Sequence, residues 1–79
     1  MANGGIYATS DIHLATALRV AGLKFVGISR EGRKGTFKFE DSPQREQIVM
    51  DFYNGDLIQN VKQFIEHWFG FKKMVSELR

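Results

Sequence analysis

Five basic side chains surround one predicted turn in the first half of the chain, and their chemistry is that of phosphate binding. They are Lys24, Arg30, Arg33, Lys34 and Lys38, and only Glu31 opposes them. Lys and Arg side chains that neutralise nucleic-acid phosphates release counterions, and a two-stranded ribbon fits the major groove of DNA. The pattern therefore predicts a contact with DNA or RNA through a projecting basic hairpin. A solvated hairpin tip, whose charges keep an edge strand from pairing with neighbours, is the alternative explanation.

Other residue types that could do chemistry are few and far apart. Asp11 and His13 stand close together, but the only other histidine, His67, is distant and lies next to Glu66. The HExxH pattern is absent, and the lack of cysteine excludes thiolate metal sites and a cysteine nucleophile. Asp11 is better explained as a first-turn carboxylate that the helix dipole favours. We therefore expect a protein that is not an enzyme, with no catalytic residue, no metal and no cofactor.

A second candidate surface lies on the last predicted helix, which is rich in aromatic residues. Its apolar stripe consists of Phe64, Trp68, Phe71, Val75 and Leu78. Core packing is the simplest explanation of that stripe, but Phe69 and Met74 lie toward its opposite edges and widen the apolar arc. A helix with so wide an arc can bury one side on the sheet and another on a partner. Phe69 and Met74 are therefore the predicted interface of a protein-protein adaptor or small regulator, with homodimerisation as one form.

The elements that position these residues follow from periodicity and capping signals. The expected order is a strand at 6–8, a helix at 11–21, strands at 23–30 and 36–40, a helix from 43 and a helix from 60. Gly22 is placed to end the first helix in a left-handed conformation. Ser42 can cap the second helix with Pro43 at its first position, and Asn60 caps the last.

The turn between the two central strands decides which residues face each other. Glu31-Gly32 is the predicted two-residue turn, because Gly accepts a positive φ. This turn would place Val26 opposite Phe37. A loop one residue longer would reverse the pairing of the two faces.

These elements predict an α+β domain at residues 6–79, preceded by a flexible N-terminus at 1–5. The sheet is small and antiparallel, and the order is β-α-β-β-α-(β)-α. If residues 56–59 add a short strand, the first six elements make a split βαβ arrangement of ferredoxin-like type with an added C-terminal helix. Because this fold hosts many unrelated functions, it does not decide the function.

Composition places the chain among globular proteins. Of its 79 residues, 43% are apolar and 25% charged, with a net charge of +2, which is too weak by itself to indicate nucleic acid. The sequence shows no signal-peptide pattern and no apolar run of the ~18 residues that a membrane span needs. Together with the absence of cysteine, this favours a cytoplasmic protein that makes no membrane contact.

Several short segments between Tyr7 and Lys72 form a pattern of their own. They are Tyr7-Ala8-Thr9-Ser10-Asp11, Leu14-Ala15-Thr16-Ala17-Leu18, Gly22, Gly35-Thr36-Phe37-Lys38-Phe39-Glu40-Asp41, Tyr53-Asn54-Gly55, and Phe64 with Lys72. The pattern resembles a small bacterial and phage domain family of unknown function. The resemblance implies a βαββα-type domain and brings no activity, substrate or binding residue.

A second likeness is to the RNA-recognition motif. The stretch 34–41, followed by a helix and Asn54-Gly55, resembles the third strand and second helix of that module. The motif has an aromatic, a small and another aromatic residue after its Lys-Gly pair. Here Thr36 occupies the first aromatic position and Phe37 the small one, which argues against base stacking on this sheet.

Overall fold

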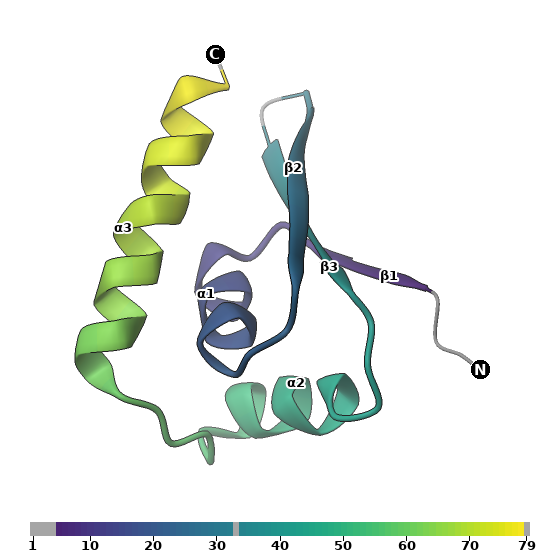
Figure 1. Cartoon of the computed structure of the whole chain (residues 1–79), viewed down its shortest axis with the longest axis vertical. Coiled ribbons are helices and arrows are strands. Elements are labelled where there is room, and N and C mark those ends of the chain that lie inside the picture. The colour runs from purple at the N-terminus through teal and green to yellow at the C-terminus, as the bar shows by residue number, and fades with distance from the viewer. Residues whose placement is uncertain (1–4, 33, 79) are drawn as a thin grey trace.

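The computed structural model describes residues 5–32 and 34–78, and within them it contains three strands and three helices (Figure 1). In chain order these are β1 (Ile6–Thr9), α1 (Ile12–Val20), β2 (Phe25–Glu31), β3 (Lys34–Glu40), α2 (Arg45–Asn54) and α3 (Val61–Glu77). The predicted α+β class with an antiparallel sheet is confirmed. The N-terminus predicted to be flexible lies, apart from Gly5, outside the described residues.

The sheet has β3 at its centre, with β1 and β2 antiparallel to it on either side. Because β1 and β2 are parallel to each other and α1 connects them, the three elements form a split βαβ unit. The strand considered at 56–59 does not form, since these residues have no regular structure. Instead, Nε2 of Gln59 donates a hydrogen bond to the carbonyl oxygen of Ala17 at 2.8 Å. This bond holds the connector against α1, away from the sheet, and the order is β-α-β-β-α-α.

The β2–β3 hairpin turns one residue later than predicted. Glu31 pairs with Lys34, and the turn therefore lies between these two residues, where Gly32 has a φ of +64°. As a result, Ile28 and not Val26 stands opposite Phe37. The register also shifts between Phe25 and Gly27, and Val26 is 51% exposed at this bulge.

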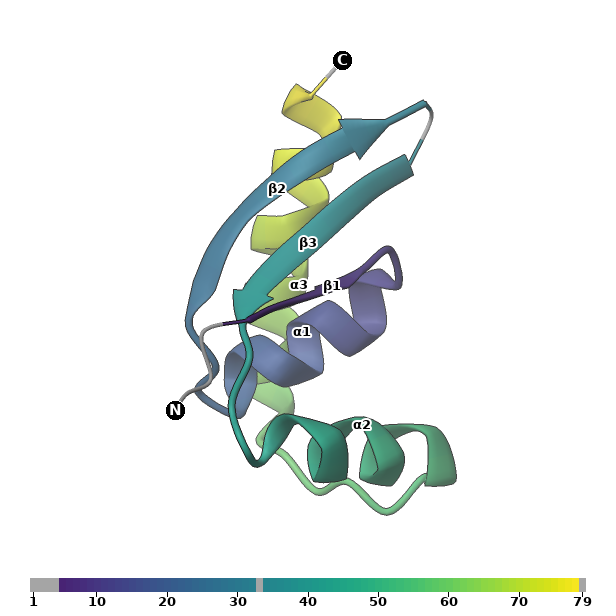
Figure 2. The ribbon, with the colours of Figure 1, turned by 90° about the vertical axis from the view of Figure 1, so that its right-hand side faces the viewer.

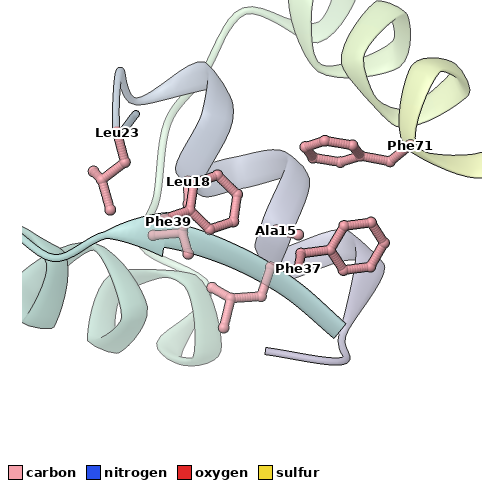
Figure 3. Packing of buried hydrophobic residues seen from close by; sticks show 7 residues of the cluster. Ala15, Leu18, Leu23, Phe37, Phe39 and Phe71 are labelled. Atoms are coloured by element: carbon pink, nitrogen blue, oxygen red, sulfur yellow. The ribbon is translucent and has the colours of Figure 1, made fainter. Parts of the chain in front are cut away.

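The core lies between the inner face of the sheet and helices α1 and α3 (Figure 2). Phe37 and Phe39 of β3 are 1% and 0% exposed, and they pack against buried residues of α1 such as Leu18. Figure 3 shows Phe71 of α3 directed at this cluster. Its ring centroid is 4.9 Å from that of Phe37 and 5.0 Å from that of Phe25. Since Phe71 is the one buried residue within α3, this ring is the main anchor of the helix.

Local hydrogen bonds explain where α1 and α3 begin. The Asp11 carboxylate accepts the backbone N–H groups of His13 and Leu14 at 2.9 and 3.2 Å. The Asn60 side chain accepts the N–H of Gln63 at 2.9 Å, and Gly22 follows α1 with a φ of +103°. The predictions that Gly22 ends α1 and that Asn60 caps α3 are confirmed, because each depends only on residues within one turn. Asp11, which was expected inside the first turn, is the N-cap of α1.

The start of α2 differs from the prediction. The helix begins at Arg45, and the side chain of Ser42 caps nothing, since its hydroxyl has no hydrogen-bond partner. Both carboxylate oxygens of Asp41 instead accept hydrogen bonds from Arg45, at 2.9 and 3.1 Å. The Arg45 guanidinium also lies 4.3 Å from the ring centroid of Tyr7. The turn before α2 is therefore organised by this ion pair, which links α2 to β1.

Acidification should weaken the fold through Asp41. The hydrogen bond from Arg45, with a smaller one from the Ser42 amide, lowers the pKa of Asp41 and outweighs the opposing effect of burial. A carboxyl group with a lowered pKa stabilises the fold above its unfolded-state pKa, and this contribution is lost as the pH falls through the folded-state pKa. We expect the native chain to melt higher than Asp41→Asn at neutral pH, and the difference in Tm to shrink below the ordinary carboxyl range. Asp56→Asn, which removes an exposed carboxylate, is the control. A difference in Tm between the native chain and Asp41→Asn that does not change with pH would contradict a stabilising role of the Asp41 carboxylate.

Candidate binding surfaces

Three of the predicted basic residues lie on the outer face of the sheet, away from the core. Along β3, Lys34 and Lys38 alternate with the buried Phe37 and Phe39, so their side chains point outward. Lys24, the residue before β2, joins them, because its Nζ lies 3.7 Å from a carboxylate oxygen of Glu40, which shares that face. Figure 2 looks onto this face, and no helix of the described chain covers it.

Arg30, in contrast, lies on the helix side of the sheet. It pairs with Gly35, and its guanidinium donates one hydrogen bond to the carbonyl of Gly32 at 2.8 Å and another to that of Leu78 at 3.2 Å. The second bond connects the hairpin to the C-terminal end of α3, where the helix dipole favours a cation. The predicted basic cluster is therefore divided between the two sides of the hairpin, and Arg33 lies outside the described residues.

The outer face of the sheet presents no phenylalanine of β3. Phe37 and Phe39 are both buried in the core. They stand one residue away from the positions at which the RNA-recognition motif has its aromatic residues. The outward residue between the two lysines is Thr36, and the exposed apolar residues nearby are Ile6 and Val26, at 54% and 51%. Stacking of bases on the β3 phenylalanines is thus excluded in this conformation.

Helix α3 carries a second exposed surface. Phe69 is 58% exposed and Met74 is 37% exposed, and their five-residue separation puts them on different flanks of the helix. Val61 and Ile65, at 70% and 44% exposed, precede Phe69 at four-residue intervals. We call Val61, Ile65 and Phe69 the α3 ridge. Sequence reasoning missed the first two: their spacing from Phe69 places them on the same strip of the helix, but it does not show that the strip is exposed.

A pocket opens at the N-terminal end of the α3 ridge. Its volume is about 340 Å³, and it is lined by Ala17, Phe52, Gly55, Leu57, Gln59, Val61 and Phe64. Next to it Ile58, at 93%, is the most exposed of the large apolar side chains. Among these lining residues only Gln59 has a polar side chain, and its amide is already bonded to α1. The pocket therefore suits an apolar group.

His13, considered above for metal or acid-base chemistry, packs on an aromatic ring. It stacks on Trp68 with ring centroids 6.2 Å apart, and Nζ of Lys72 lies 4.5 Å from the Trp68 centroid. The described residues hold no group of three or more His, Asp or Glu side chains that could bind a metal ion. Nor does any helix within them have the length and apolar character needed to cross a membrane.

The geometry defines a small split βαβ domain with helices on one face of its sheet, an uncovered opposite face and an exposed apolar helix ridge. The chain belongs to the DUF5659 family, described as a domain of unknown function, whose profile matches residues 5–76. The resemblance to a small domain family of unknown function is confirmed at this level. Neither the curated proteins nor the solved structures contain a significant match.

Proposed function

We propose that this domain is a non-enzymatic module that binds another protein through the α3 ridge. The observation that carries the proposal is the row of Val61, Ile65 and Phe69, which are 44% to 70% exposed. Residues spaced by four along a helix form a continuous strip, here about 12 Å long. Each Å² of such apolar surface that a partner covers contributes roughly 25 cal/mol, and exposed apolar strips mark interaction sites for that reason.

The surroundings of the α3 ridge support protein binding over catalysis. The adjoining pocket is lined by apolar residues and by one amide, so it offers no group for proton transfer or nucleophilic attack. Ile58 extends the apolar surface beyond the start of the helix. Lys62 and Glu66 border it, which gives the polar rim typical of protein interfaces.

A site-specific photo-crosslinker tests the proposal. The reactive amino acid is placed at Ile65 or Phe69 of the full chain in living cells, with exposed Glu46 of α2 as the matched control position. We expect a discrete protein adduct from the two ridge positions and none from position 46. If the ridge positions yield no protein adduct, or the same adducts as position 46, the ridge is not a protein-binding surface.

A second candidate function, nucleic-acid contact, is favoured by the lysines on the uncovered sheet face. Lys24, Lys34 and Lys38 share this face with the hydroxyl group of Thr36, while Glu40 offsets Lys24. Such a row can follow phosphates without reading bases. In this form the contact lies on the surface of the sheet and not at the hairpin tip, and the domain would bind nucleic acid or a nucleoprotein.

Salt-dependent fluorescence anisotropy tests this second function with labelled single-stranded and duplex DNA and RNA. Replacing Lys34 and Lys38 by alanine should weaken binding for all sequences, and each lost phosphate contact should reduce the log–log salt slope by about 1. Arg19→Ala with Lys73→Ala removes the same charge from exposed positions of α1 and α3 and is the control. Equal losses in both variants would mean that only net charge matters, and no binding at low salt would remove this function.

A further inference from the structure

We propose that the partner covering the α3 ridge is a second copy of this chain, whose α3 packs antiparallel to the first around a two-fold axis. This inference rests on the protein-binding role proposed above and names its partner. A two-fold interface requires one surface to carry both halves of each contact. The α3 ridge and the pocket beside it have that property in their spacing, their charges and their shape.

The spacing of the ridge fits an antiparallel copy of itself. A two-fold axis at the height of Phe64 brings the partner subunit's Ile65 to a height between Val61 and Ile65. The partner subunit's Val61 then falls between Ile65 and Phe69. Val61 and Ile65 of each subunit thus enter gaps between two apolar side chains of the other, as in ridges-into-grooves packing of helices. The four-residue spacing of the exposed residues therefore needs no adjustment to interdigitate.

The charges beside the ridge fit the same register. Lys62 and Glu66 are exposed on the same flank of α3, and in the described chain neither lies within ion-pair distance of an opposite charge. A two-fold axis perpendicular to the helices brings like flanks together. With the axis at Phe64, Lys62 meets Glu66 of the partner subunit, and the reverse contact forms on the other side. Two complementary pairs would thus border the apolar contact.

The pocket supplies the remaining complement. In this register the partner's Phe69 reaches the height of Gln59, where the 340 Å³ pocket opens beside Val61. An aromatic side chain that fills an apolar pocket is the usual anchor of a protein interface. Phe69 projects into solvent with 58% of its surface exposed, and the dimer would hold two such rings in two identical pockets.

Cysteine pairing tests the register, because the chain has no native cysteine. Under mild oxidation Ile65→Cys should give a disulfide-linked dimer, while Val61→Cys and Phe69→Cys alone should not. A mixture of Val61→Cys and Phe69→Cys should link, because these positions meet across the axis. Met50→Cys, exposed on α2, is the control. Self-linking of Val61→Cys would indicate parallel helices, and linking at Met50 as fast as at Ile65 would indicate random collisions; either result would overturn the proposal.

A charge exchange tests the ion pairs in the chain with its native ridge. Sedimentation equilibrium of the native chain should give a species of twice the 9.0 kDa chain mass. Lys62→Glu and Glu66→Lys should each weaken dimerisation at least tenfold, and the double variant should recover most of the loss. Far-UV circular dichroism checks that α3 remains helical in each variant. A monomeric native chain at millimolar concentration would overturn the inference; a ridge photo-adduct with a different protein would then leave the protein-binding function standing without self-association.

Discussion

Replacing Phe71 by alanine is expected to lower the free energy of unfolding by about 3–5 kcal/mol, the usual cost of removing a buried phenylalanine ring. Phe71 is 3% exposed, and its ring lies against those of Phe25, Phe37 and Phe39 at centroid distances of 4.9 to 6.4 Å. Because small domains are stable by only about 5–15 kcal/mol, the loss should be visible as a lower urea midpoint.

Phe69→Ala is the matched control for this prediction. The two phenylalanines lie two residues apart on α3, but Phe69 is 58% exposed. At concentrations where the chain is monomeric, we expect Phe69→Ala to change the free energy of unfolding by less than about 1 kcal/mol. Equal destabilisation by the two variants would mean that α3 does not pack on the sheet through Phe71. The pair of variants therefore separates the core side of the helix from its ridge.

The local parts of the fold could be predicted from the sequence, because their causes lie within one turn of the chain. Asp11 and Asn60 cap their helices, and Gly22 closes α1, as their residue types indicate. The start of α2 was wrong because the carboxylate of Asp41 binds Arg45, a choice that competes with capping by Ser42. The sequence left open whether residues 56–59 add a strand, and the answer depends on Ala17, which is distant in sequence and accepts a hydrogen bond from Gln59.

The candidate surfaces were only partly predictable, for two different reasons. Strand alternation together with the predicted two-residue turn places Arg30 on the other side of the hairpin from Lys34, so the division of the basic cluster could have been predicted. The exposure of Val61 and Ile65 could not, because it depends on the side from which α1 packs against α3. Periodicity identifies the apolar arc of a helix, but tertiary packing decides which part of that arc remains in water.

Tertiary packing also decides what happens when Gly35 of β3 is replaced, and a large side chain there should lower the stability of the fold. A Cβ atom at this position would lie 3.3 Å from Cδ1 of Ile28 and 3.4 Å from Cγ2 of Val75. Gly35→Leu should therefore push the last turns of α3 away from the sheet, at a cost of about 1–3 kcal/mol for overpacking. This cost exceeds the roughly 0.5–1 kcal/mol that any non-glycine residue gains within a strand. Urea unfolding measures the loss, and faster amide exchange at Val75 and Leu78 locates it.

Gly27→Leu supplies the control for Gly35→Leu within the same hairpin. Gly27 belongs to β2, its φ is not in the left-handed region, and a Cβ there would meet no atom within 4 Å. Leucine at Gly27 should therefore not lower the stability, and it should gain the roughly 0.5–1 kcal/mol of a non-glycine residue within a strand. If Gly35→Leu were tolerated equally well, α3 would have to shift along the sheet without loss of packing. Such a shift would break the hydrogen bond from Arg30 to Leu78. If the amides of α3 nevertheless stayed protected from exchange, the C-terminal half of the helix would be held by Phe71 and not by contacts at Gly35.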